Sequence, residues 1–330
     1  MSQGGCAMSL KRIHCPQSKL ILPCTSLLVL LGLSGLSSQL SAQQTAHDTL
    51  QEQIQTYSAV AATANPPGVN SVAAGRIWAH LGTLYENAGM YSQSESSYLH
   101  ALHLLELPPV SEVDRARALD DLGTLYMVKG DTEQADRAEQ KALKLREAAG
   151  LRADLPRSWY HLATLSLREH RAVTALDYAA KAVSQLNSAN NVNPDDQINA
   201  QFVMGAALCR LHRYSEAIAA MKSAMDAVHE AYGLDDFPTG FGSFLLGYAY
   251  WKSGDLDHAE ELMRFGSEQV KRQLGWEHPA CILVMNQYQR FLRNTHRLDE
   301  ARSLEEQLKK IREAPIFGQS RETLVLASLF

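Results

Sequence analysis

The sequence predicts an all-α protein, a solenoid of antiparallel helix hairpins, on two observations. A small or equivalent residue recurs within apolar, helix-like segments at positions 82, 123, 163, 205, 247 and 289, so the period is 40 to 42 residues. A second small residue follows each of these after twelve positions, as Ser94, Ala135, Ala175, Ala217, Ala259 and Ala301. A constant period indicates stacked repeats, because one helix hairpin cannot bury both of its faces alone.

Gly247 shows why a small residue is needed on the first helix of each repeat. Glycine inside a helix costs about 1 kcal/mol relative to alanine, yet Gly247 stands in the middle of the apolar segment LLGYAYW. We expect it to meet the alanine of the second helix, because only small side chains allow so close an approach. Burial of Leu246 and Tyr250, worth about 1.5–3 kcal/mol each, offsets the penalty.

The repeats are predicted in order along the chain. A single helix at residues 47–63, within a segment of residues 43–74, is expected to cap the first repeat. Six repeats then fill residues 75–313, and the densely charged last helix, Leu298 to Glu313, suits a terminal cap with a solvated face. Residues 314–330 leave the pattern and are predicted to form a tail. Turn and breaker residues mark the joints; they are Asn65-Pro66-Pro67-Gly68, Pro108-Pro109, Gly150, Asn193-Pro194, Tyr232-Gly233 and Gly275.

One stretch carries a family resemblance. Residues 78–85, WAHLGTLY, fit the pattern W-x2-L-G-x2-Y of the tetratricopeptide repeat family. The long period resembles that of kinesin light chains and many bacterial tetratricopeptide proteins, whose joints read L-G-x-x-H-P, as residues 274–279 do here. The resemblance implies a right-handed superhelix with a concave binding face. Light-chain repeats carry paired asparagines where this chain has, for example, Asp120-Asp121, so light-chain cargo recognition does not carry over.

Composition and motifs argue against several functions. The chain has 31 basic and 36 acidic residues, and this mildly acidic balance disfavours binding to a nucleic-acid backbone. No H-E-x-x-H, G-x-S-x-G, P-loop or C-x-x-C motif is present. His100 and His103 lie three apart without a third ligand nearby, so we interpret them as surface or packing residues. We therefore predict no enzyme activity, no cofactor and no metal.

The N-terminus predicts export. Three basic residues, Lys11, Arg12 and Lys19, precede an apolar run at residues 27–36, and small residues follow up to Ala42. This order is typical of a signal peptide, so residues 1–42 are expected to be cleaved off and the mature chain to be periplasmic or secreted, with no stable membrane span. An uncleaved anchor helix remains the alternative.

Two cysteines, Cys209 and Cys281, remain after the expected cleavage. They are separated by nearly two repeats, on the order of 20 Å, beyond the reach of a disulfide. We expect both to be buried apolar residues.

The resemblance also implies which residues face a partner. In that family, a few positions of each first helix make the concave face. The same repeat positions in this sequence hold arginines at the two ends of the array and aromatic residues between them. Two alternatives stay open: the aromatics pack between repeats, and the arginines are solvated or paired with Asp120 or Asp121. The candidate residues are Arg76, Arg117, Arg157, Tyr160, Phe202, Phe241, Phe244, Tyr248, Trp251, Arg290 and Arg293.

These residues predict a non-catalytic scaffold for protein–protein interaction. Aromatic and arginine side chains usually dominate interface energies, so we expect repeats three to five to bind a peptide or protein segment that is apolar with acidic residues near its ends. A structural protein of the envelope, or an accessory subunit of an enzyme or secretion assembly, is the alternative function.

Overall fold

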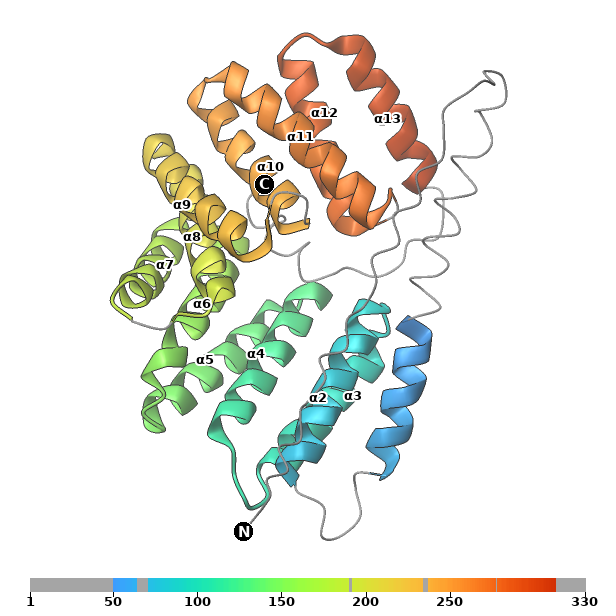
Figure 1. Ribbon diagram of the computed structural model, residues 1–330, viewed down its shortest axis with the longest axis vertical. Coiled ribbons are helices and arrows are strands. Elements are labelled where there is room, and N and C mark those ends of the chain that lie inside the picture. The colour runs from blue at the N-terminus through green and yellow to red at the C-terminus, as the bar shows by residue number, and fades with distance from the viewer. Residues whose placement is uncertain (1–49, 64–70, 190–191, 234–236, 277, 313–330) are drawn as a thin grey trace, which may run out of the picture. The chain divides into compact units, whose positions relative to one another are not determined.

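The computed structural model describes residues 50–63, 71–189, 192–233, 237–276 and 278–312 (Figure 1). All of them belong to the compact unit from Gln43 to Phe330. These residues form α-helices and one short 3-10 helix, η1 (Arg152–Asp154), and within them there is no strand. The predicted signal peptide, residues 1–42, and the predicted tail, residues 314–330, lie outside the described residues.

The described helices after residue 70 pair into six successive hairpins, so the predicted all-α repeat solenoid is confirmed. A separate helix covers residues 50–63 before the first hairpin. Each second helix packs against the first helix of the next hairpin, which stacks the repeats (Figure 1). The pairs are α2 (Ser71–Asn87) with α3 (Tyr91–Leu105), α4 (Glu112–Lys129) with α5 (Thr132–Ala148), α6 (Leu155–Arg168) with α7 (Ala172–Asn187), α8 (Pro194–Arg210) with α9 (Tyr214–Tyr232), α10 (Phe237–Ser253) with α11 (Leu256–Leu274), and α12 (Pro279–Asn294) with α13 (Leu298–Arg312).

The turn inside each hairpin needs one residue in the left-handed backbone conformation. Glycine, which adopts this conformation without steric cost, supplies it in the first, second and fifth repeats. Histidine supplies it in the other three, with φ between 59° and 61°. The residues are Gly89, Gly130, His170, His212, Gly254 and His296. The turns therefore follow the same period as the small helix residues.

The joint before the sixth repeat explains the L-G-x-x-H-P pattern. Gly275 ends α11 with a φ of 78°, a value that favours glycine. The backbone N–H of Ala280 donates to His278 Nδ1 at 3.2 Å, so the histidine caps α12. Pro279 then occupies the first turn, where a missing N–H costs nothing.

The small residues on the first helices make room for a different partner from the one expected. A Cβ atom added at Gly247 would lie 2.8 Å from the Cγ atom and 2.9 Å from the backbone nitrogen of Met263, not against Ala259. The expectation that Gly247 mainly contacts the alanine of the second helix is therefore wrong. The alanines twelve residues after the small residues are nevertheless buried. The absence of a side chain at each of these glycines leaves a gap on the first helix, which we call the glycine notch. The side chain sixteen residues later fills it, as in the pairs Gly82–Tyr98, Gly123–Glu139, Gly205–Met221 and Gly247–Met263.

The apolar core is largest in the C-terminal repeats. One continuous cluster of buried side chains runs from Ala163 to Leu308 and joins repeats three to six. Cys209 and Cys281 lie in it, buried and unpaired as predicted, and burial raises the pKa of each thiol to about 12. A smaller cluster around Tyr98 and Leu125 serves the first repeats.

Candidate functional site

A surface hollow lies between the first helices of repeats five and six. It has a volume of about 350 Å³ and combines aromatic, basic and amide side chains. We call it the aromatic–basic pocket; α10 contributes Tyr248, Trp251 and Lys252, and α12 contributes Gln287, Arg290, Arg293 and Asn294.

The aromatic side chains of this pocket are held in place by contacts with the protein core. The Trp251 ring meets Tyr248 edge-on at 5.7 Å and meets Phe291 in the same way at 5.7 Å. Because Phe291 is completely buried, it anchors the partly exposed tryptophan to the core. Lys252 Nζ lies 4.3 Å from the Trp251 ring centroid and 5.2 Å from that of Tyr248, within the range of cation–π attraction.

The pocket is positively charged. Three of its lining residues are cations, Lys252, Arg290 and Arg293, and none is a carboxylate. Burial and the neighbouring charge of Arg290 lower the pKa of Lys252, while burial raises the pKa of Tyr248 to about 12. Arg293 pairs at 2.7 Å with Glu305 on the outer helix α13. This arrangement suits an anionic group that sits beside an apolar or aromatic one.

The predicted arginines at the N-terminal end of the groove connect repeats to one another. Arg76 binds both carboxylate oxygens of Asp114 at 3.0 and 2.8 Å, and Arg157 binds Asp196 at 3.0 and 2.8 Å. Each pair joins the first helices of two successive repeats. Of the alternatives left open, pairing holds for these two arginines, but with Asp114 and Asp196 in place of Asp120 or Asp121. Arg117 is exposed on α4.

Aromatic residues at the fifth position of the first helix do not form one surface. Phe202 and Phe244 are 4% and 0% exposed and belong to the core of repeats three to six, so their placement on a binding face is corrected. The missing side chain of Gly242 leaves room for the Phe202 ring, which would lie 2.7 Å from a Cβ there. Phe241 is half-buried against the same core. Tyr160 is half-buried, and its hydroxyl donates to Asp196 at 3.2 Å.

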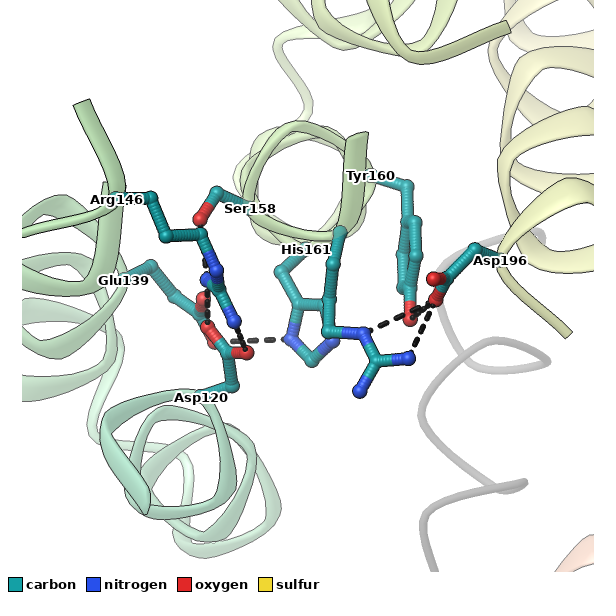
Figure 2. Close-up of polar contacts among 8 residues, drawn as sticks. Asp120, Glu139, Arg146, Ser158, Tyr160, His161 and Asp196 are labelled. Atoms are coloured by element: carbon teal, nitrogen blue, oxygen red, sulfur yellow. Dashed lines mark hydrogen bonds and ion pairs between the residues drawn. The ribbon is translucent and has the colours of Figure 1, made fainter. Parts of the chain in front are cut away.

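A second polar assembly, which the sequence did not reveal, lies inside the protein between repeats two and three (Figure 2). The Arg146 guanidinium donates to both oxygens of Asp120, at 2.9 and 2.5 Å, and to the Ser158 hydroxyl at 2.6 Å. The side chains of Arg146 and Asp120 are only 1% and 3% exposed. We call this assembly the buried polar cluster; it consists of Asp120 on α4, Glu139 and Arg146 on α5, and Ser158 and His161 on α6.

Glu139 and His161 form the titratable part of the cluster. His161 Nδ1 lies 3.1 Å from Glu139 Oε1, and Glu139 is completely buried. Burial raises the pKa of Glu139 to about 7. Burial alone would lower the pKa of His161, but the charge and hydrogen bond of Glu139 raise it overall. The sequence held one signal of this pair, a glutamate at the register position where Met221 and Met263 stand in later repeats.

Two further classes of site were sought in the residues that the structure describes. No three histidine, cysteine or acidic side chains there come together as metal ligands would. Within the same residues, no helix combines the length and the apolar composition that crossing a bilayer requires.

Known proteins resemble this chain in fold. Residues 243–264 match the model of the tetratricopeptide repeat family. Comparison with curated protein sequences finds no match. The crystal structure of BtubC (BKLC) from P. vanneervenii is 18% identical, with a TM-score of 0.58 over 68% of this chain and 92% of that one.

Two Rap proteins are also similar. The apo form of RapI is 10% identical, with a TM-score of 0.63 over 82% of this chain and 94% of that one. The Rap conjugation gene regulator of the plasmid pLS20, in complex with the Phr* peptide, is 15% identical, with a TM-score of 0.58 over 86% and 80%. With the repeat register and the six stacked hairpins, these likenesses lead to one conclusion. The chain has the fold of a tetratricopeptide-like helical solenoid with long repeats, and its residues 243–264 match the tetratricopeptide repeat model.

Proposed function

We propose that this chain is a non-catalytic scaffold for protein–protein interaction and that a segment of the partner binds in the aromatic–basic pocket. One observation carries the proposal: two partly exposed aromatic rings and three cations from adjacent repeats line a single hollow. Partly exposed aromatics anchored in a core are typical interface hot spots. The binding of the Phr* peptide by a structurally similar Rap regulator supports a peptide as the ligand class.

The chemistry of the pocket defines the partner segment. Trp251 and Tyr248 offer apolar area, while Lys252, Arg290 and Arg293 offer positive charge without an acid in the lining. We therefore expect a segment with an apolar or aromatic residue close to an acidic one. Because Phe202 and Phe244 are buried, the contact region shifts from repeats three to five toward repeats five and six.

The test uses the full chain to select binders from a displayed library of short random peptides, and then compares variants with the best binder. Trp251→Ala and Tyr248→Ala are each expected to lose about 2 kcal/mol of binding free energy, about thirtyfold in affinity. Trp159→Ala is the matched control, because Trp159 is also half-buried but lines a separate hollow on α6 and α7.

The outcomes separate the alternatives. Loss of affinity in the two pocket variants, with unchanged thermal unfolding and with normal binding by the Trp159 variant, supports the proposal. Normal binding by folded pocket variants contradicts it. Unfolding of both pocket variants contradicts it as well, because Trp251 and Tyr248 would then be core residues.

We also propose that the chain is exported, since a basic segment, an apolar run and small residues precede Gln43 in that order. N-terminal sequencing of the native protein tests this. We expect a mature terminus near Gln43; an intact Met1 or Met8 on a cytoplasmic species would refute it.

A further inference from the structure

The side chain that fills the glycine notch is apolar in repeats four and five and ionisable in repeat two. Met221 and Met263 fill the notches of repeats four and five, while Glu139 fills that of Gly123. A Cβ atom on residue 123 would lie 2.5 Å from Glu139 Oε1, so the notch holds the carboxyl group itself. Burying a carboxylate costs far more than burying a thioether unless the charge is compensated.

We propose that the Glu139–His161 pair makes the junction between repeats two and three sensitive to protons: the protonated pair holds α5 against α6, and loss of its proton loosens this junction. The pair is placed for this role, because Glu139 belongs to the second repeat and His161 to the third (Figure 2). The inference concerns a different part of the molecule from the aromatic–basic pocket and does not depend on the proposed function.

The surrounding charges offset the lost proton only in part. Arg146 faces the pair from α5, but its guanidinium is already bound to Asp120 of α4 and to Ser158. Asp154 of η1 adds a further negative charge near Arg146.

On α6, Arg157 is bound to Asp196. Glu139 Oε2 is buried and has no hydrogen-bond partner among the residues that the structure describes. An ionised Glu139 beside a neutral His161 would therefore share the positive charge of Arg146 with Asp120 at a completely buried position.

The sign of the pH dependence follows from both groups. Burial raises the pKa of Glu139 from 4.5 to about 7, and Glu139 raises that of His161 above 6.5 against the effect of burial. The folded junction thus keeps protons that the open chain has released. Its extra stability is complete below about pH 4.5, falls as the pH rises toward and through 7, and is absent above the two folded-state pKa values.

Hydrogen exchange of the full chain, read by mass spectrometry from about pH 5 to pH 8.5 and corrected for the intrinsic rate at each pH, tests the proposal. Opening of the junction should release one proton. The equilibrium constant for opening, measured at amides of α5 and α6, should therefore rise by up to about tenfold per pH unit until neutral pH and then level off. Amides of α10 and α11 should show no such rise.

Two variants make the result specific. Glu139→Gln keeps the shape of the side chain but cannot ionise, so most of the rise should disappear. His258→Gln is the control, because His258 forms an exposed pair with Asp255 at 2.8 Å and should leave the rise unchanged. An undiminished rise in Glu139→Gln, or an equal rise in every repeat, would overturn the proposal.

A measurement on the unmodified protein keeps the test decisive if Glu139→Gln does not fold. The ring signals of His161, followed by nuclear magnetic resonance, should titrate above pH 6.5 and report a coupled second step near 7. Titration of His161 at or below 6.5 in the folded protein would show that Glu139 does not stabilise the proton on His161, and would equally overturn the proposal.

Discussion

The second and fifth repeats solve the same packing problem with opposite chemistry. In both, a glycine on the first helix leaves a notch for the side chain sixteen residues later, yet Gly123 receives the carboxyl group of Glu139 and Gly247 receives the thioether of Met263. The sequence spacing between the glycine and the residue that fills its notch is the same in both, so the hairpin accepts either side chain there. The residue in the notch then decides whether the junction beside it is apolar or responds to protons.

The difference extends to how each half of the solenoid is held together. Repeats three to six share one apolar cluster that reaches from Ala163 to Leu308. In the first two repeats, acid–base pairs take part: Arg76–Asp114 spans the junction between them, and Asp120–Arg146 is buried inside the second. We infer that the N-terminal half is the more sensitive to charge and pH, while the C-terminal half supplies a firm base for an exposed pocket.

Removing a buried charge should produce the largest effect. Asp120→Ala leaves Arg146 buried without its carboxylate, and breaking such a pair typically destabilises a protein by about 3–5 kcal/mol. Asp177→Ala, which removes an exposed acid from α7, is the control and should change little. Urea unfolding measures both; a loss below about 1 kcal/mol in Asp120→Ala would show that the pair does not hold α4 and α5 together.

Filling a notch should have an intermediate effect. In Gly247→Ala the new methyl group meets the backbone nitrogen of Met263 at 2.9 Å, and overpacking of this kind costs about 1–3 kcal/mol. In Gly123→Ala the group meets only the side chain of Glu139, so the loss should be smaller. Thermal unfolding compares the two. A stabilised Gly247→Ala protein would mean that helix propensity outweighs the close contact.

Removing an exposed arginine should have the smallest effect. The Arg76 side chain is 65% exposed although Asp114 beside it is buried, and the attraction of such pairs is weak and screened by salt. Arg76→Ala should therefore shift the urea midpoint slightly at low salt and less at high salt. A large shift that does not depend on salt would contradict this ranking.

The repeat architecture could be predicted because it depends on spacing. The period of the small residues fixed the six hairpins, and the L-G-x-x-H-P joint already contained the cap His278 and the first-turn Pro279. Register also placed Tyr248 and Trp251 near Arg290, and the structure brings these side chains to one pocket.

What the sequence did not reveal depends on contacts between distant residues. Phe202 and Tyr248 both lie on first helices, and only the packing of the next repeat decides that the first is buried and the second partly exposed. The pair Arg157–Asp196 spans 39 residues, and nothing in the local pattern distinguishes Asp196 from other acids. The buried polar cluster was missed for the same reason, because Glu139 looks like an ordinary helix residue until its notch is known.

If a partner segment binds between α10 and α12, a bound peptide should protect these two helices from hydrogen exchange. Hydrogen exchange of the full chain is measured with and without the selected peptide. We expect slower exchange in α10 and α12, around Trp251 and Arg290, with little change in α4 and α6. Protection of α4 and α6 without any in α10 and α12 would contradict it.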